Sequence, residues 1–350
     1  MIRIDVGKKC LIMLLLAISL RIQGQQKIEV QTLSKENIFT LAPFKQCHAS
    51  SLIELGKNTL MSAWFGGSYE GAKDVCIWAS INKKGKWNAP ICLVCGVVSD
   101  SLRYACWNPV LFRTRKKGLK LYYKVGPNPR EWVGMEIISN DNGKTWSKPY
   151  HLKGILGPIK NKPIELASGS WLNPSSTETL TQWKAFMERS TDKGKTWKVI
   201  PIDTSNEAKV IQPTLLVYPG RKIQALCRSN QNCVMESYSM DDGQSWSELK
   251  KTNILNPNSG IDAVTLQSGL QVLVYNPMQS GKEWVHGRNK LNVAISRDGI
   301  VWTDIYKLED QQEGEYSYPA IIQSTDGMVH ITYTDNRKSI KYVSLKIKEE

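Results

Sequence analysis

A short turn motif recurs along the chain and constrains the fold more than any other feature of the sequence. Its clearest copy is Ser139–Trp146, which reads S-x-D-x-G-x-T-W, and it returns as Ser190–Trp197 and Ser239–Trp246. A shortened copy is Ser296–Trp302 and a degenerate one is Ser80–Trp87, so the five copies begin 59, 51, 49 and 57 residues apart in chain order. A period near 50 residues is typical of one supersecondary unit used repeatedly, as in propellers and solenoids.

The residue types of this motif suit a turn that closes on itself. Its Asp side chain can accept hydrogen bonds from nearby backbone N–H groups, and its Gly adopts a positive φ angle at low cost. The leading Ser can hydrogen-bond locally, and the closing Trp supplies a large apolar anchor with a single donor. We therefore interpret the motif as a hairpin turn between two outer strands, with a structural and not a chemical role.

A second repeat lies between the turn motifs. Each copy is an apolar strand, a Gly-containing turn and another apolar strand, a pattern that predicts a β-hairpin. The six copies are Leu52–Phe65, Val110–Val125, Ile164–Leu172, Thr214–Arg228, Ala263–Tyr275 and Ala320–Thr334. Six four-stranded units predict an all-β fold, namely a six-bladed β-propeller.

The two ends of the chain can complete this ring. A lone strand, Ile340–Leu345, follows the last hairpin, and Ile28–Leu33 is left free to complete the same blade. Closure of one blade by opposite termini would lock the ring. The degenerate early repeats leave a seventh blade open, and an open solenoid, for which we find no capping repeat, is the main alternative.

The first 24 residues have the pattern of an export signal. Two lysines precede the apolar run Cys10–Leu20, and Gly24 stands at a suitable cleavage point. The run is too short to span a bilayer, and no other segment is long enough for a membrane helix. We therefore expect residues 1–24 to be a signal peptide and residues 25–350 a single propeller domain. The mature protein is expected to be an exported monomer (periplasmic, cell-surface or secreted) without membrane insertion.

Composition favours an acidic glycan as the partner. The formal net charge is +14, which attracts polyanions in general, and the chain carries no nucleic-acid-binding motif. The 12 Trp and 13 Tyr against only 5 Phe suggest half-exposed aromatic side chains, as on a sugar-binding surface. We therefore expect an acidic polysaccharide or oligosaccharide to bind, and no nucleic acid.

Cysteine and histidine give no clear framework for a metal or a cofactor. Of eight Cys, Cys10 belongs to the leader, which leaves an odd number with no evident pairing. The Cys92-x-x-Cys95 pair lacks a second pair, so buried strand cysteines are favoured over a metal or redox site. We expect no cofactor and no metal site, although a structural cation in the channel stays open.

Polar residues precede the first strand of each hairpin. In a propeller the innermost strands run beside the central channel, so the residues just before them gather at one mouth. These stretches are Cys47–Ser50, Cys106–Pro109, Lys160–Pro163, Ile211–Pro213, Gly260–Asp262 and Glu315–Pro319. Polar residues that converge from six distant parts of a chain predict a functional pocket.

The repeated turn and this polar mouth together resemble the sialidase superfamily. The S-x-D-x-G-x-T-W turn is that superfamily's Asp-box, and the resemblance covers roughly residues 40–345. It implies a substrate carboxylate held by three Arg, a Tyr nucleophile paired with a Glu, and an Asp acid/base. On this resemblance Arg228 and Arg288 match the second and third Arg, Tyr316 in Tyr316-Ser317 matches the nucleophile, and Asp74 fills the acid/base place.

Two positions depart from the sialidase pattern. His48 stands about where the first Arg is expected, and Gln212-Pro213 stands where the family has Glu-Pro. A Gln cannot take a proton from Tyr, which argues against nucleophile activation as in sialidases. Four segments resemble a divergent sialidase-like branch that we associate with lyases acting on rhamnosyl-glucuronate termini: His48–Ser50, Trp64–Gly67, Gly157–Pro163 and Asn256–Asp262.

The residue types at the mouth suit recognition of a carboxylate. Arg228 and Arg288 could clamp it in bidentate fashion, and Arg103, beside Tyr104, is a third candidate. The other substrate-binding candidates are Gln212, Asp262, Asn161 and Lys162.

The remaining candidates supply acid–base chemistry. His48 titrates near neutrality and is the candidate general base, while Tyr316 or Tyr318 could donate or receive a proton. Such a set suits β-elimination from a uronate. Arg neutralises the carboxylate and acidifies the α-proton, a base removes that proton, and an acid protonates the leaving oxygen.

Three functions fit these residues. The leading one is a secreted carbohydrate-active enzyme that cleaves a terminal acidic-sugar linkage by β-elimination. The first alternative is a sialidase-like exo-glycosidase, a hydrolase with an altered active centre. The second alternative is a non-catalytic glycan-binding propeller that lost activity when Gln212 replaced Glu.

Overall fold

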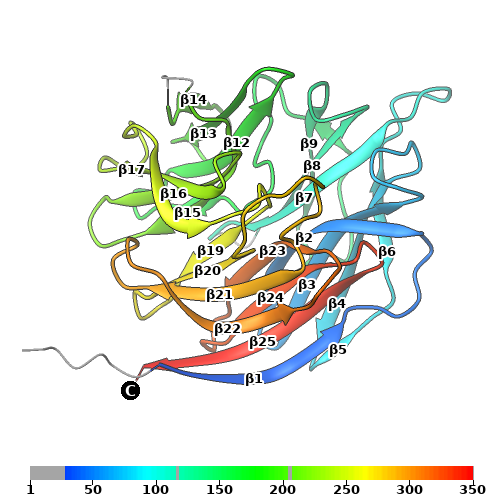
Figure 1. Ribbon diagram of the computed structural model, residues 1–350. Helices are drawn as coiled ribbons and strands as arrows, with labels where there is room; N and C mark the ends of the chain where they lie inside the picture. The colour runs from blue at the N-terminus through cyan, green and yellow to red at the C-terminus, as the bar shows by residue number, and fades with distance from the viewer. Residues whose placement is uncertain (1–27, 116–117, 204–206, 350) are drawn as a thin grey trace, which may run out of the picture.

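The computed structural model describes residues 28–115, 118–203 and 207–349, and every regular element in these ranges is a β-strand. The strands form six sheets that follow one another around a central axis (Figure 1). The prediction of an all-β, six-bladed β-propeller is therefore confirmed. The predicted signal peptide, residues 1–24, lies outside the described residues. Within them, no helix has the length and apolar character needed to cross a membrane.

Five blades are four-stranded antiparallel sheets, and blade one has a fifth strand that pairs with its third. The strand named first in each blade below is the innermost one. Blade one contains β2 (Gln46–Gly56), β3 (Thr59–Gly67), β4 (Cys76–Lys83) and β5 (Lys86–Trp87), with β6 (Ile91–Cys95) paired to β4. Blade two contains β7 (Ala105–Arg113), β8 (Leu119–Gly126), β9 (Val133–Ser139) and β10 (Tyr150–His151). Blade three contains β11 (Ile164–Glu165), β12 (Trp171–Glu178), β13 (Trp183–Ser190) and β14 (Lys198–Pro201).

The second half of the ring repeats the same plan. Blade four contains β15 (Val210–Val217), β16 (Ile223–Ser229), β17 (Cys233–Ser239) and β18 (Lys250–Leu255). Blade five contains β19 (Asp262–Thr265), β20 (Gln271–Tyr275), β21 (Lys290–Ser296) and β22 (Thr303–Asp310). Blade six contains β23 (Tyr316–Gln323), β24 (Val329–Asp335), β25 (Ser339–Glu349) and β1 (Ile28–Asn37).

Blade six is closed by the two ends of the described chain. The N-terminal β1 pairs with the C-terminal β25 in antiparallel register, from Ile28 opposite Glu349 to Asn37 opposite Lys341. Figure 1 shows these two strands side by side, the first in blue and the last in red. This is the closure that the free N-terminal strand predicted. It closes the ring because β1, from the other end of the described chain, supplies the fourth strand of the blade.

The core lies between the blades. The second strands are buried on both faces, so β3 and β8 are buried at nearly every position, including Lys124 of β8. Trp64, Tyr122, Tyr123 and Tyr333 are among the largest fully buried side chains. Outer strands such as β18 are exposed at most positions. Packing therefore fixes the inner half of each blade, and with it the strand ends that surround the mouth of the channel.

The repeated turn joins the third and fourth strands of a blade, as its residues predicted. In the copy that begins at Ser139, the Ser Oγ accepts from Gly143 N at 2.8 Å and donates to Asp141 Oδ1 at 2.8 Å. Thr145 donates to the same carboxylate from Oγ1 at 2.6 Å and from N at 2.9 Å. The bonds from Thr145, followed by those from Ser139 and Lys144, lower the pKa of Asp141 to about 2. The turn is scaffold, because its Ser, Asp, Gly and Thr groups bond one another, while the buried indole nitrogen of Trp146 has no hydrogen-bond partner among the described residues.

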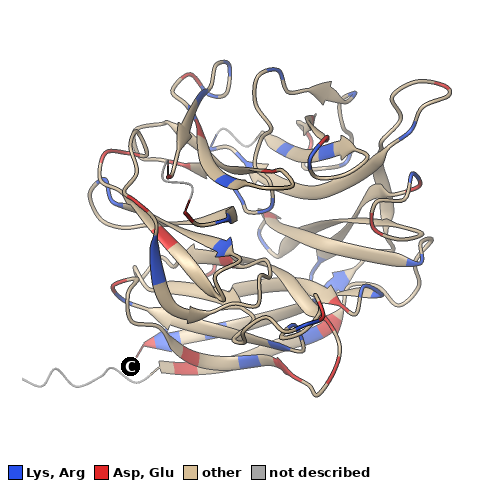
Figure 2. Cartoon of the chain, turned by 45° about the horizontal axis from the view of Figure 1, so that its top comes forward, with Lys and Arg blue, Asp and Glu red and all other residues tan. Residues whose placement is uncertain are grey.

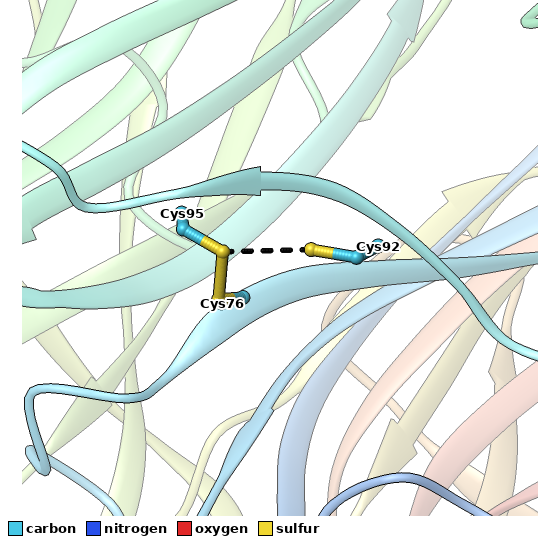
Figure 3. A group of neighbouring side chains, drawn as sticks. All are labelled: Cys76, Cys92 and Cys95. Atoms are coloured by element: carbon cyan, nitrogen blue, oxygen red, sulfur yellow. Dashed lines mark hydrogen bonds between the residues drawn. A yellow bond between two sulfur atoms is a disulfide. The ribbon is translucent and has the colours of Figure 1, made fainter.

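One disulfide lies in blade one. It joins Cys76 of β4 to Cys95 of β6, and the exposed Cys92 has its sulfur 3.5 Å from the sulfur of Cys95 (Figure 3). The other free cysteines of the described chain are buried, namely Cys47, Cys106, Cys227 and Cys233. The expectation that Cys92 and Cys95 are buried strand cysteines is therefore wrong, because Cys92 is exposed and Cys95 forms the disulfide with Cys76.

Basic and acidic side chains are interleaved around the ring. Figure 2 shows Lys and Arg on strands and loops of all parts of the visible surface, with Asp and Glu between them. The basic side chains of the described residues are therefore spread around the ring. Three arginines meet at the channel mouth, as described next.

Candidate functional site

A cavity of about 470 Å³ opens at the end of the ring where the innermost strands begin. Its lining includes the predicted residues His48, Arg228, Arg288 and Tyr318, together with Arg337, which was not predicted. Another cavity, of about 340 Å³, lies between blades two and three and is lined mainly by apolar groups. None of the predicted site residues lines it, so the chemistry gathers at the first cavity.

A backbone bulge recurs on four innermost strands just below this mouth. In β2, β7, β15 and β23 two residues face one on the neighbouring strand. The first bulge residue has a positive φ in each case, namely 57° at Ala49, 35° at Asn108, 53° at Gln212 and 51° at Tyr318. A non-glycine residue there costs of order 1–3 kcal/mol. Bulges re-aim side chains, and here they turn Gln212 and Tyr318 toward each other.

Tyr318 is held at the centre of the site by its hydroxyl group. Its oxygen accepts from Arg228 Nη1 at 2.6 Å and from Gln212 Nε2 at 3.4 Å. Arg228 also donates to Gln212 Oε1 at 3.3 Å and to Asn258 Oδ1 at 2.7 Å. Because the phenol oxygen accepts both bonds, its own proton has no partner among the described residues and is available to a ligand.

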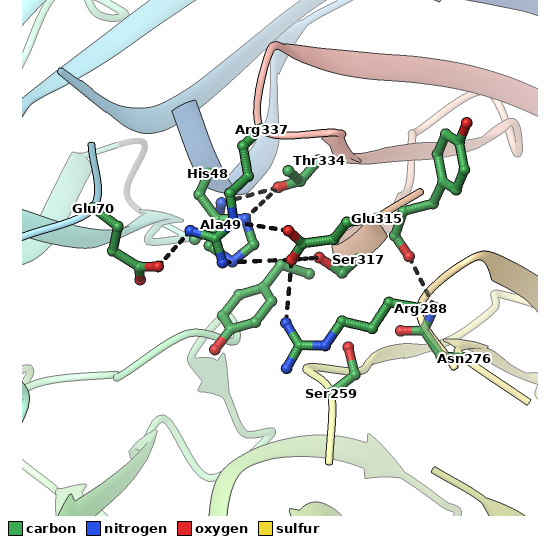
Figure 4. A network of polar contacts seen from close by, with 12 residues as sticks. His48, Ala49, Glu70, Ser259, Asn276, Arg288, Glu315, Ser317, Thr334 and Arg337 are labelled. Carbon is green, nitrogen blue, oxygen red and sulfur yellow. Dashed lines mark hydrogen bonds and ion pairs between the residues drawn. The ribbon is translucent and has the colours of Figure 1, made fainter. Parts of the chain in front are cut away.

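Glu315 organises the other two arginines (Figure 4). It accepts from Arg288 Nη1 at 3.1 Å, from Arg337 Nε at 2.7 Å and from Ser317 Oγ at 2.8 Å. Arg337 also forms an ion pair with Glu70 across the mouth. Burial opposes the charge of Arg337, but Glu70 and Glu315 together raise its pKa. Burial and the nearby Arg228 lower the pKa of Arg288.

Two features show that the arginine cluster is incompletely satisfied. Arg288 Nε is buried and makes no hydrogen bond to any described residue, and the same holds for the neighbouring Ser259 Oγ (Figure 4). Trp284, 59% exposed, lies against the guanidinium groups of Arg288 and Arg337, whose centres are 5.0 and 4.9 Å from its ring. A buried polar group without a partner costs free energy, so an acceptor in the cavity would be favoured.

His48 is a neutral imidazole packed on Tyr318. Their ring centres are 4.2 Å apart, and His48 Nδ1 lies 2.8 Å from Thr334 Oγ1. Thr334 Oγ1 already accepts from Ala49 N, so its hydroxyl proton is free to go to Nδ1, which places the ring proton on Nε2. Burial first, and then Arg337, Arg288, Arg228 and Lys160, lower the pKa of His48 well below 6.5. The group is therefore a hydrogen-bond donor and a poor base.

Three predicted substrate-binding residues instead hold the blades together beneath the cavity. Lys162 Nζ forms a 2.9 Å ion pair with Asp262, whose carboxylate also accepts from Thr214 Oγ1 at 2.8 Å. Asn161 Nδ2 donates to the backbone oxygen of Gln212 at 2.9 Å. These side chains link blades three, four and five, and none of the three predicted residues lines the cavity.

Three other predicted residues lie away from the cavity. Tyr316 is two residues before Tyr318, and its hydroxyl accepts from Asn336 Nδ2 at 3.4 Å. Asp74 is exposed and accepts from Ser68 Oγ at 2.6 Å, and this bond is the main cause that lowers the pKa of Asp74. Arg103 Nη2 lies 2.8 Å from the sulfur of Cys76, so the third arginine at the mouth is Arg337 and not Arg103.

The family assignment follows from the sequence of the repeats together with this geometry. The family model of the BNR repeat-like domain matches residues 58–331. The chain belongs to this family. Its propeller places it in the sialidase superfamily, as the turn motifs and the mouth residues suggested.

Individual relatives of this BNR propeller are distant. The anhydrosialidase of Macrobdella decora is 25% identical over an alignment of 232 residues. This alignment covers 59% of this chain and 30% of that protein. The chain thus spans less than a third of that curated relative.

Solved structures share the same fold. A protein of unknown function from Dyadobacter fermentans superposes with a TM-score of 0.73 at 15% identity, covering 91% of this chain and 99% of that one. The Hadza microbial sialidase Hz136 superposes with a TM-score of 0.71 at 17% identity, covering 87% and 66%. At these identities the likeness is one of fold.

The residues that sequence analysis missed come from a second set of loops. In this BNR propeller the connections between second and third strands reach the same mouth as the starts of the innermost strands. They bring Glu70, Trp284 and Arg337 to the cavity. The hairpin turn Asn336-Arg337 has positive φ at both residues, 51° and 56°, a conformation that the Asp335–Lys338 sequence alone does not signal.

A metal has one geometrically suitable group in the described ranges. Only Cys76, Cys92 and Cys95 bring three or more His, Cys, Asp or Glu ligand atoms within 4.8 Å of one another. Two of these sulfurs form the disulfide, so the group as it stands offers one thiol. The carboxylate of Asp262 in the channel is paired with Lys162, which supplies positive charge there.

Proposed function

We propose that this propeller is an exported glycan-active enzyme that cleaves the bond beside a terminal acidic sugar. One observation carries the proposal: Arg228, Arg288 and Arg337 line a single cavity together with the Tyr318 hydroxyl. The names of the anhydrosialidase and sialidase relatives support a glycan substrate. Export, an acidic glycan partner and independence from a cofactor belong to the same proposal.

The substrate carboxylate would bind to the arginine cluster. Arg228 donates hydrogen bonds to Tyr318 and Asn258. The buried Nε of Arg288 has no hydrogen-bond partner among the described residues, so it is available to a substrate oxygen. Guanidinium donors match carboxylate oxygens in bidentate geometry, and charge-assisted hydrogen bonds are about twice as strong as neutral ones. This binding would place the carbon that bears the carboxylate beside the Tyr318 oxygen.

In the hydrolytic version of the reaction, the Tyr318 oxygen attacks the anomeric carbon while the bond to the leaving oxygen breaks. Arg228, 2.6 Å from the phenol oxygen, stabilises negative charge that develops there. Water then replaces tyrosine at the sugar. Because Gln212 cannot accept the phenol proton, that proton passes to solvent before the attack, and Arg228 stabilises the phenolate that attacks and that is released again when water replaces it.

His48 acts in this proposal as a fixed donor. Its Nε2–H would bond a substrate oxygen while Thr334 holds the other ring nitrogen. Beside three arginines, burying a neutral imidazole costs less free energy than burying a further cation would. The neutral ring adds a hydrogen-bond donor without adding charge repulsion. The role of general base, which the sequence suggested for His48, is the less favoured one because of its lowered pKa.

The second candidate is β-elimination from a uronate. The observation that favours it is Gln212 beside Tyr318, because an eliminating enzyme needs no carboxylate at that place. Here the phenol proton of Tyr318 first passes to solvent, and the phenolate that remains is stabilised by Arg228. The phenolate removes the proton α to the carboxylate, the arginines stabilise the enolate, and the bond from the β-carbon to its oxygen breaks as the double bond forms. The abstracted proton is balanced by one delivered to the leaving oxygen.

Product analysis distinguishes these candidates. The protein would be incubated separately with a fluorogenic aryl α-sialoside and with a rhamnosyl-glucuronate oligosaccharide. Release of the free sugar acid indicates hydrolysis, and ultraviolet absorbance of an unsaturated uronate indicates elimination. Tyr318→Phe should lower turnover at least ~10²-fold, whereas Tyr316→Phe should leave it unchanged. Binding of both ligands without turnover would instead indicate a glycan-binding propeller.

A further inference from the structure

The proposed reaction needs a group that protonates the leaving oxygen, and the residues described so far do not assign one. Of the two carboxyl groups that line the cavity, Glu70 is ion-paired with Arg337 and Glu283 is exposed. Gln212 carries no titratable proton, and His48 is held neutral. Asp74, the acid/base candidate of the sequence analysis, is exposed and tied to Ser68, which lowers the pKa of Asp74 and keeps it ionised. A general acid must instead be a carboxyl that is partly shielded from water and placed beside the cavity.

Glu178 occupies such a place at the end of β12. Pairing between β12 and β13 runs without a register break from Trp171 to Glu178, so side chains alternate regularly along the strand. Ser176 and Glu178 therefore share one face. Ser176 Oγ accepts from the backbone N of Gln212 at 3.2 Å, which shows that this face is turned toward the site.

The strand direction carries Glu178 to the mouth. β12 follows the innermost β11 and runs antiparallel to it, so β12 ends where the innermost strands begin. Two residues of strand span about 7 Å. Glu178 thus lies one strand repeat beyond Ser176, on the face of blade three that is turned toward Gln212 of blade four.

The surroundings of Glu178 are those of an acid. Burial raises its pKa, Arg228 and Arg130 oppose the rise, and Glu70 adds to it. Arg228 and Glu70 both line the cavity, so the charges that act on Glu178 surround the mouth. Within the described part of the chain, its carboxyl group forms no hydrogen bond or ion pair.

We infer that Glu178 is the general acid of the proposed reaction. Its carboxyl proton passes to the leaving-group oxygen as the carbon–oxygen bond of the substrate breaks, which leaves a carboxylate. In hydrolysis this carboxylate then takes a proton from the water that releases the sugar from Tyr318, and the acid form returns. The inference rests on the proposed function and adds to it a proton donor from blade three.

The test compares two leaving groups in Glu178→Gln. A nitrophenyl leaving group needs no proton, whereas an oligosaccharide leaving group does. The variant should lose ~10²–10⁴-fold in kcat/KM on the oligosaccharide and less than ~10-fold on the nitrophenyl glycoside, the range expected of a general acid. It should also lose the alkaline limb of the pH profile of kcat/KM for the oligosaccharide.

A matched control lies at the other end of the same blade. Glu165 of β11 is half-buried and pairs with Arg115, and Glu165→Gln should leave both substrates and the pH profile unchanged. Equal losses on the two substrates in Glu178→Gln, or no loss on either, would overturn the role of Glu178 and leave the proposed function intact. Failure of the wild-type protein to turn over any acidic glycoside that it binds would overturn the proposed function and the acid role together.

Discussion

The neutral state of buried His48 predicts a pH dependence of stability that is specific to this residue. His48 is buried, and Arg337, Arg288 and Arg228 add to the effect of burial in lowering its pKa well below 6.5. In the unfolded chain its pKa returns to about 6.5. Below that pH the unfolded state therefore binds a proton that the folded state excludes, and the free energy of unfolding falls as pH falls.

The size of the effect follows from linkage. Once the unfolded form is fully protonated, one excluded proton costs about 1.4 kcal/mol per pH unit. Between pH 6 and pH 5, His48 should thus contribute a loss of about 1 kcal/mol. His48→Gln keeps a polar side chain opposite Thr334 but cannot be protonated. Its free energy of unfolding should therefore fall by about 1 kcal/mol less than that of the wild type between pH 6 and pH 5, even if the variant is less stable at every pH.

Urea unfolding at pH 7, 6 and 5 measures these slopes. Carboxylates and the buried His330 also contribute to the pH dependence, so the slope of each variant is compared with the wild-type slope. His151→Gln is the matched control, because His151 is exposed, and its slope should equal that of the wild type. A slope in His48→Gln that equals the wild-type slope would show that the folded protein accepts a proton on His48, which would refute the assignment of a neutral donor.

Three further predictions test other parts of the structure. Glu315→Gln should lower the free energy of unfolding by ~3 kcal/mol, because it leaves buried guanidinium groups without their carboxylate; Glu309→Gln, which unpairs Lys341, should be similarly destabilised but keep normal turnover. Gln212→Glu should speed hydrolysis of an aryl sialoside at least ~10-fold if Tyr318 is the nucleophile, and should not if it is a base in elimination. Native alkylation followed by mass spectrometry should modify Cys92 alone among the described cysteines, and modification of a second one would contradict its unique exposure.

The fold was predictable because its signals are local. Within the turn at Ser139–Trp146 the Ser, Asp, Gly and Thr groups bond one another, and the copies that begin at Ser190 and Ser239 repeat these local bonds. Repetition of that turn then gives the number of blades. The free strand at Ile28–Asn37 and the unpaired strand at the other end give the closure. None of these inferences needs a contact between distant residues to be known in advance.

The site was predictable only in part. Its central residues converge because the innermost strands all begin at one mouth, which is a property of the ring. The choice between Tyr316 and Tyr318 was not available from the sequence, since strand alternation places both on one face. The bulge at Tyr318, with φ of 51° and a register break between Ser317 and Ala320, separates them.

The charged frame of the cavity was missed for a related reason. Arg337 and Glu70 belong to different blades and meet only when the ring is closed. Lys162 and Asp262 were predicted to bind substrate, but they satisfy each other between blades three and five. A polar residue near the axis of a propeller can bind a ligand or can hold neighbouring blades together. The sequence does not distinguish the two roles, because the role depends on which residue lies opposite across the channel.

The most direct test of the central claim is the affinity for a carboxylate itself. Titration calorimetry would compare sialic acid and glucuronic acid, each with its methyl ester, which keeps the sugar and removes the charge. Loss of the charge-assisted bonds to the arginine cluster should weaken binding of the preferred sugar by about 3 kcal/mol, or ~100-fold. Equal affinity for acid and ester in both pairs would contradict recognition of an acidic sugar by Arg228, Arg288 and Arg337.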